Sequence, residues 1–291
     1  MSESKLKTIF SVSFYFVICA TFIYNLQYIV EVILIEDADW DPINVTAVKF
    51  AVIGLTGFFF TYFFIKWQQI DLKSLGLDLE RKKITTYVVF GAFLGMLALL
   101  STAFIEIAGE AIGAEVAKER ADKLAISEVA LLVAFQLLFV GPGEELIFRG
   151  YIQGETEKVL GPLKAILLSA CAFGLIHVLF YLSINPESVV IIFVSSAIAG
   201  LGFGYARYVS GNLSYPIAIH GFWNALAFIL QIEYVWGYDP KAVGFMEFVV
   251  ETLATTLGIG LIVIITYWLA RFTPIFDEAR VNSQGFEPAN T

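Results

Sequence analysis

The chain has 291 residues, of which 58% are hydrophobic and only 15% are charged, and its formal net charge is −9. Soluble domains carry charged side chains at about 25% of their positions, so this composition excludes an ordinary soluble domain and indicates a membrane protein. No basic patch accompanies the negative net charge, which argues against nucleic acid as a partner.

Apolar stretches follow one another along the whole chain, and each is long enough to cross a bilayer. The hydrocarbon core is about 30 Å thick, so a spanning helix needs about 20 residues. Such a segment must satisfy its own backbone hydrogen bonds in lipid, so we expect helices. The stretches cover residues 9–35, 44–67, 84–110, 125–152, 162–182, 187–207, 213–233 and 246–271. The sequence therefore predicts an all-α, polytopic membrane protein with about eight transmembrane helices.

The predicted helices form one bundle, and no connection between them is long enough to fold separately. We therefore expect residues 1–291 to be a single transmembrane domain, with a disordered cytoplasmic tail at 277–291. Lys and Arg follow the second, fourth, sixth and eighth stretches, and such residues favour the cytoplasmic side of a membrane. This pattern predicts that both termini are cytoplasmic. Short loops without an ER-retrieval signal favour a prokaryotic plasma membrane.

Polar side chains gather in three of the predicted helices. Charged groups are costly inside a bilayer, so they are functional candidates wherever they occur there. The only two histidines of the chain belong to this group. GPGEELIFRG contains Glu144, Glu145 and Arg149, FGLIHVLF contains His177, and SYPIAIHGFWNA contains His220 and Asn224.

The spacing of these residues places some of them on shared helix faces. Glu145 and Arg149 are four residues apart, so they can neutralise each other inside the membrane. Glu144 then points to a different face. His220 and Asn224 are also four residues apart and share a face.

Proline and glycine predict two local features of the helices. Pro142 removes a backbone donor and clashes one turn back, so we expect a kink or break there. Glycines one turn apart let neighbouring helices approach closely. Such pairs occur at Gly91 and Gly95 and at Gly200 and Gly204.

The polar residues have the chemistry that hydrolysis of an amide requires. A carboxylate beside a neutral imidazole can take a proton from water, and Glu144 with His177 supplies this pair. An imidazole N–H and a carboxamide N–H can bind an oxyanion, and His220 with Asn224 supplies those donors. Gln136 is interpreted as a contact between helices.

Two other interpretations of the same residues stay open. A glutamate and two histidines form a known catalytic zinc set, although asparagine is a poor zinc ligand and no HExxH motif is present. The residues could also serve packing in a non-catalytic immunity factor, scaffold or transporter. A transporter would favour an internal inverted repeat, and the sequence has none.

Three motifs in this region resemble those of a known family. The motifs EExxxR, FxxxH and HxxxN stand here as Glu144-Glu145-xxx-Arg149, Phe173-xxx-His177 and His220-xxx-Asn224. In this order, each in its own apolar segment, they resemble the CPBP family. That family includes type II CAAX prenyl endopeptidases and the bacteriocin-processing and abortive-infection proteins of prokaryotes. The resemblance covers roughly residues 125–230, the expected catalytic core.

The resemblance implies an intramembrane endopeptidase with a conical cavity that faces the cytoplasm. It implies a peptide or lipidated protein as substrate, for example a prenylated CAAX tail. Our main hypothesis is a glutamate-dependent endopeptidase with no obligatory cofactor or metal ion. The resemblance also implies a role for each motif residue. Glu144 and His177 would activate water, Glu145 and Arg149 would support that helix, and His220 and Asn224 would form the oxyanion hole.

Overall fold

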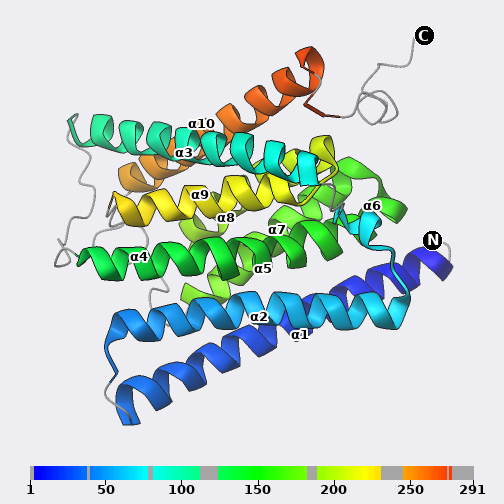
Figure 1. Ribbon diagram of the computed structural model, residues 1–291, viewed down its shortest axis with the longest axis horizontal. Coiled ribbons are helices and arrows are strands. Elements are labelled where there is room, and N and C mark those ends of the chain that lie inside the picture. The colour runs from blue at the N-terminus through cyan, green and yellow to red at the C-terminus, as the bar shows by residue number, and fades with distance from the viewer. Residues whose placement is uncertain are drawn as a thin grey trace.

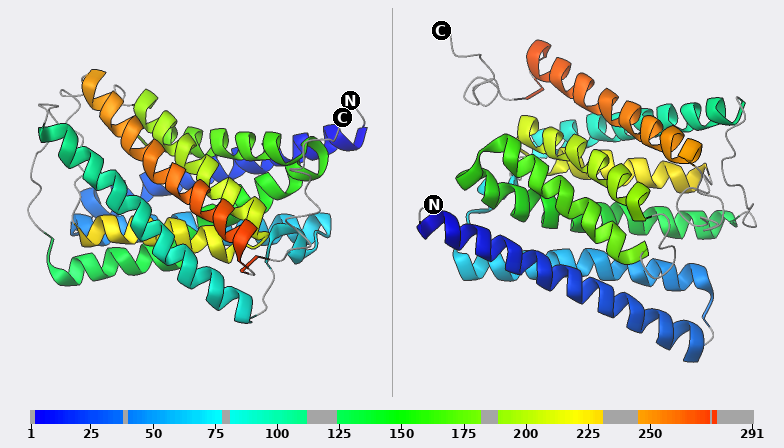
Figure 2. Two further views of the ribbon diagram at one scale, coloured as in Figure 1. Left: turned by 90° about the horizontal axis from the view of Figure 1, so that it is seen from above. Right: turned by 180° about the vertical axis from the view of Figure 1, so that it is seen from behind.

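A computed structural model describes residues 3–37, 40–77, 81–111, 124–181, 189–230, 245–273 and 275–276. The secondary structure of these residues is helical, and none of them lies in a strand. The long helices lie side by side in one bundle (Figures 1 and 2). The predicted all-α, polytopic fold is therefore confirmed. The predicted tail at 277–291 lies outside the described residues.

The helices follow one another with short connections, and several long ones contain 3₁₀ or π-helical turns, which are labelled η. In chain order the elements are α1 (Glu3–Glu31), η1 (Val32–Asp37), α2 (Pro42–Gln68), η2 (Leu72–Leu75), α3 (Arg81–Ala111), α4 (Ile126–Phe135), η3 (Gln136–Val140), α5 (Gly141–Glu145), η4 (Leu146–Gln153), α6 (Gly154–Leu160), α7 (Pro162–Tyr181), α8 (Val189–Ser210), α9 (Ser214–Ile229) and α10 (Phe245–Phe272).

Seven helical segments of the described chain are long and apolar enough to cross a membrane. They correspond to seven of the predicted stretches. The remaining stretch, 213–233, contains α9, which has 16 residues. At a rise of about 1.5 Å per residue, such a helix is about 24 Å long and falls short of the hydrocarbon core. Helix α9 nevertheless packs inside the bundle, between α3 and the helix that contains α4 (Figure 1).

The helix from Ile126 to Leu160 continues through Pro142 without a break. The π-helical turn η3 directly precedes the proline, and the backbone N–H of Gly141 donates to the carbonyl of Gln136, five residues back. A π-helical turn widens the backbone where the proline ring would clash with the preceding turn. The predicted break at Pro142 is therefore absent, and a π-helical turn precedes the proline instead.

Glycines allow close contacts between helices. A Cβ atom added to Gly91 or Gly95 would clash with the backbone of α9, and one added to Gly200 would clash with α7. These contacts confirm the approach that the glycine spacing predicted. Gly57 of α2 lies against the backbone of Gly143 in the same way. Helix α2 therefore touches the main chain directly beside the glutamates of α5.

The basic connections gather at one end of the bundle (Figure 1). A guanidinium N–H of Arg207 donates to the carbonyl of Ser74 at 3.3 Å, and Lys158 donates to the Ser74 hydroxyl at 3.4 Å. The backbone N–H of Leu213 donates to the carbonyl of Gly76 at 2.9 Å. The connections that the charge pattern assigned to one side thus lie together. That this side is cytoplasmic stays a prediction.

Candidate active site

The first motif, EExxxR, and the third, HxxxN, meet at one carboxylate oxygen. Oε1 of Glu145 accepts a hydrogen bond from Arg149 at 2.7 Å and another from Nδ1 of His220 at 2.9 Å. Glu145 and Arg149 are 0% exposed, and His220 is 4% exposed. The predicted pairing of Glu145 with Arg149 is confirmed, and the same oxygen also fixes the ring of His220 from α9.

Glu144 faces the other nitrogen of the same imidazole. Its Oε2 lies 3.7 Å from Nε2 of His220, and this oxygen is buried without a hydrogen-bond partner. Because Nδ1–H of His220 donates to Glu145, its Nε2 is left to face Glu144. The two neighbouring glutamates thus differ in environment. Oε1 of Glu145 accepts two hydrogen bonds, whereas Oε2 of Glu144 faces the imidazole and accepts none.

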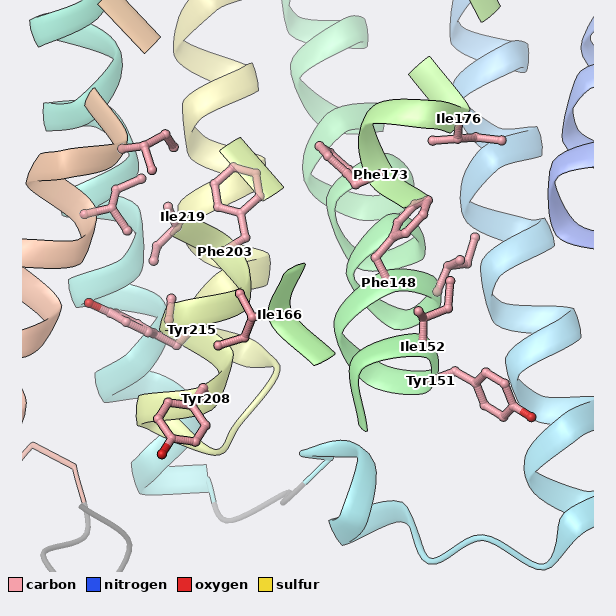
Figure 3. Packing of buried hydrophobic residues seen from close by; sticks show 14 of the residues in the cluster. Phe148, Tyr151, Ile152, Ile166, Phe173, Ile176, Phe203, Tyr208, Tyr215 and Ile219 are labelled. Atoms are coloured by element: carbon pink, nitrogen blue, oxygen red, sulfur yellow. The ribbon is translucent and has the colours of Figure 1, made fainter. Parts of the chain in front are cut away.

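Arg149 is held by a carbonyl and by aromatic rings. One guanidinium N–H donates to the Gly200 carbonyl at 3.2 Å, and the guanidinium carbon lies 4.4 Å from the centre of the Phe173 ring and 5.2 Å from that of Phe203. Rings at this distance stabilise a cation through their π electrons. Phe148 and Phe173, on facing helices, belong to the buried hydrophobic cluster around this site (Figure 3).

The tautomer of His177 is set by its own helix. Its Nδ1 lies 2.8 Å from the carbonyl oxygen of Phe173, which can only accept, so Nδ1 carries the proton. In the neutral ring Nε2 then has the free electron pair. The ring of Phe173 is 4.5 Å from the ring of His177 and 5.7 Å from that of His220. His177 also interacts electrostatically with Glu144, so the three motifs converge on one place.

Asn224 contacts the helix that contains the glutamates. Its Nδ2 donates to Oε1 of Gln136 at 3.0 Å. Gln136 is 3% exposed, whereas Asn224 is half-buried, as is His177. The interpretation of Gln136 as a contact between helices is confirmed. His177 and Asn224 are thus the partly exposed members of the site, whereas Glu144, Glu145, Arg149 and His220 are buried.

The contact of Phe203 with the site could not be predicted from the sequence. The ring of Phe203, from α8, stacks on the ring of His220 at 4.8 Å with an interplanar angle of 18°. Phe203 stands in an apolar segment in which nothing distinguishes it from other core residues. Only the packing of α8 against α9 shows that it holds the imidazole plane in place.

The site contains several buried polar atoms without a hydrogen-bond partner. Among the described residues these include Oε2 of Glu144, Oε2 of Glu145 and Nε of Arg149. Buried polar atoms in proteins are nearly always paired, because an unpaired one loses its hydration without compensation. A concentration of such atoms at one place is typical of a site that binds and converts a ligand.

The zinc interpretation requires protein side chains that converge on one ion. No group of three or more His, Cys, Asp or Glu side chains in the described part of the chain is arranged to hold an ion. Oε1 of Glu145 and Nδ1 of His220 are bonded to each other. The arrangement of these side chains therefore gives the zinc interpretation no support, and metal dependence stays a prediction for the chelator experiment.

A groove of about 530 Å³ lies between the start of α2 and α4, away from the site. Its lining includes Trp40, Asn44, Leu131 and Phe135, and none of the motif residues. This groove is therefore not the expected cavity at the motif residues, and a cavity that faces the cytoplasm stays a prediction.

Comparison with known proteins agrees with the position of the site. Residues 126–226 match the family model of Rce1-like type II CAAX prenyl endopeptidases. A search of curated proteins found no match, and neither did a search of solved structures. The matched segment runs from the start of α4 into α9, and it contains all three motifs and every residue that contacts them above. Over this segment, about a third of its length, the chain is similar to the Rce1-like type II CAAX prenyl endopeptidases.

Proposed function

We propose that this protein is a glutamate-dependent intramembrane endopeptidase, in which Glu144 and His177 activate a water molecule and His220 and Asn224 bind the oxyanion. The similarity of residues 126–226 to a family of membrane endopeptidases supports a protease. The residue roles rest chiefly on one observation. Oε2 of Glu144 is buried without a hydrogen-bond partner and lies 3.7 Å from Nε2 of His220, whereas Glu145 is paired with Arg149 and His220 through its Oε1.

The water-activating half consists of Glu144 and His177. With Nδ1–H donated to the Phe173 carbonyl, the free electron pair of His177 is on Nε2. A water molecule between this nitrogen and the Glu144 carboxylate would be oriented by both groups and would lose its proton to one of them as it attacks. The hydroxide oxygen would form a bond to the carbonyl carbon of the scissile peptide.

The oxyanion half consists of Asn224 and His220. Nδ2 of Asn224 has two hydrogens, and Gln136 takes one of them, so the second is available to a substrate. His220 donates Nδ1–H to Glu145, and its role would need a further proton on Nε2. The carboxylates of Glu144 and Glu145 face the two ring nitrogens at 3.7 and 2.9 Å.

Collapse of the tetrahedral intermediate completes the reaction. The bond from carbon to the amide nitrogen breaks, and the proton taken from water passes from the Glu144–His177 pair to the leaving amine. Glu145 and Arg149 do not touch the reacting atoms in this scheme. They hold His220, since one oxygen of Glu145 binds both Arg149 and the imidazole.

The family name makes a prenylated CAAX peptide the first substrate to test. The purified protein in detergent would be given a farnesylated CAAX peptide and the same peptide without the lipid, with and without a chelator. We expect wild type to cleave the lipidated peptide in both conditions, and Glu144→Ala and His177→Ala to lose cleavage. Glu155→Gln serves as the control, because Glu155 is also buried but pairs with Lys158 outside the site.

Each other outcome has a definite meaning. Loss of cleavage with chelator would favour the zinc interpretation. Equal cleavage of the two peptides would remove the requirement for a lipid. Cleavage that persists in both alanine variants would contradict the proposed roles of Glu144 and His177. A wild type that cuts neither peptide would contradict the prenyl substrate and favour a different substrate or the non-catalytic alternative.

A further inference from the structure

Gln136 is a buried amide with no place in the three motifs. It lies in η3, on the helix that contains Glu144, and only 3% of it is exposed. A buried amide is costly unless it is hydrogen-bonded. Its oxygen accepts from Asn224 of α9 at 3.0 Å. The cost of burying Gln136 is thus offset by a bond to a residue of the oxyanion half.

This bond selects one orientation of the Asn224 carboxamide. An asparagine side chain has an oxygen on one side and an NH₂ group on the other, and the two can exchange by a half-turn. Because Oε1 of Gln136 can only accept, it bonds to Nδ2 and keeps Oδ1 of Asn224 away from that side. The second hydrogen of Nδ2 then has a defined direction, which a free side chain would lack.

The backbone around Gln136 sets the position of this bond. The carbonyl of Gln136 accepts from the N–H of Gly141 across the π-helical turn. A Cβ atom on Gly141 would lie 3.2 Å from Cα of Gly221, so the two helices cross closely at these glycines. Gly141 stands between Gln136 and Glu144 in the chain, and Gly221 stands between His220 and Asn224. One crossing therefore places both bonds between the helices, Gln136 to Asn224 and Glu145 to His220.

We infer that Gln136 is a positioning residue that turns Nδ2–H of Asn224 toward the oxyanion and couples the oxyanion half to the helix of Glu144. The inference rests on the proposed function, in which Asn224 is an oxyanion donor. Gln136 itself does not touch the substrate.

The test is a double-mutant cycle on peptide cleavage. Gln136→Met keeps the size of the side chain and removes the acceptor, whereas Gln136→Glu keeps an oxygen that can accept from Nδ2. Loss of a complete oxyanion donor costs about a hundredfold in kcat, so a misdirected donor in Gln136→Met is expected to cost about tenfold, with KM within about twofold. Gln136→Glu should recover most of the rate. In the Asn224→Ala background, Gln136→Met should cause no further loss of kcat.

A matched control distinguishes positioning from packing. Gln153 is another fully buried glutamine of the same long helix, and it donates to the Gly204 carbonyl rather than to Asn224. Gln153→Met makes the same chemical change, and its effect on kcat should be the same with Asn224 present or absent. If the effects of Gln136→Met and Asn224→Ala were likewise independent, Gln136 would be a packing residue and the inference would be overturned.

A measurement without substrate separates this inference from the proposed function. In protein labelled with ¹⁵N-asparagine, the side-chain NH₂ signal of Asn224 is identified by its loss in Asn224→Ala. We expect Gln136→Met to shift this signal and Gln153→Met to leave it in place. An unshifted signal in Gln136→Met would overturn the inference even if wild type cleaves peptide. A shifted signal in a protein that cleaves nothing would leave the hydrogen bond established and contradict the proposed function alone.

Discussion

The helix that contains the glutamates has two buried polar clusters that differ in charge. The neutral cluster joins it to α1 and α2. There Gln68 donates to the Tyr151 hydroxyl at 2.7 Å, and that hydroxyl lies 3.1 Å from the hydroxyl of Ser11. Nearby, the hydroxyls of Tyr15 and Thr61 are 2.6 Å apart. The neutral cluster consists of Ser11, Tyr15, Thr61, Gln68 and Tyr151.

The charged cluster consists of Glu144, Glu145, Arg149 and His220. It contains three buried atoms without a hydrogen-bond partner, whereas no buried side-chain atom of the neutral cluster lacks one. Both clusters lie among apolar residues, so burial alone does not distinguish them. The neutral cluster thus joins helices through hydrogen bonds among its own side chains. The charged cluster has polar atoms left without a partner, to which a water molecule or a substrate could bond.

The largest effect on kcat is expected at Glu144, whose Oε2 has no hydrogen-bond partner. Glu144→Gln keeps the shape of the side chain but removes the carboxylate, so kcat for peptide cleavage should fall about a thousandfold or more. The free energy of unfolding should not decrease, because the lost charge had no hydrogen bond at Oε2. Cleavage assays and denaturation in detergent would measure the two quantities. A large loss of stability would mean that Glu144 is a structural residue and would remove the contrast between the clusters.

A loss of stability is expected at the paired end of the charged cluster. Arg149→Met leaves Glu145 buried without its cation, and breaking a fully buried pair in this way costs about 3–5 kcal/mol. Removing both charges with Glu145→Gln and Arg149→Met should recover part of that loss, since no lone charge is then left in the core. Denaturation monitored by circular dichroism would compare the variants. Equal stability of the single and the double variant would show that a lone buried Glu145 costs no stability, which would contradict the expected role of the ion pair.

The smallest effect is expected in the neutral cluster. Tyr151→Phe removes the hydroxyl that Ser11 and Gln68 contact, which should lower the free energy of unfolding by about 1–2 kcal/mol. Its kcat should stay within about twofold of wild type, because the cluster has no unpaired group to offer a substrate. A fall in kcat close to that of Glu144→Gln would show that the neutral cluster also takes part in the reaction.

Much of the site could be predicted from the sequence, because charges in apolar helices are conspicuous. Two histidines and a Glu-Glu-xxx-Arg motif in hydrophobic segments point to one centre, and the spacing of Glu145 and Arg149 follows from helix periodicity. Helix periodicity predicts that Glu144 and Glu145 point to different faces, but it does not predict which nitrogen of His220 each one faces. That assignment depends on where α9 crosses, and a single segment contains no information on that crossing.

The sequence by itself determined that this chain is an all-α membrane protein, where seven of its long apolar helices lie, and which polar residues are costly there. Composition and periodicity are local properties, and the hydrocarbon core imposes length and helicity on every apolar run. Only the tertiary structure decided that Gln136 bonds to Asn224, that Phe203 stacks on His220, and that Pro142 is accommodated by a π-helical turn. These features arise from contacts between helices far apart in the chain or from small backbone adjustments, which residue types alone do not specify.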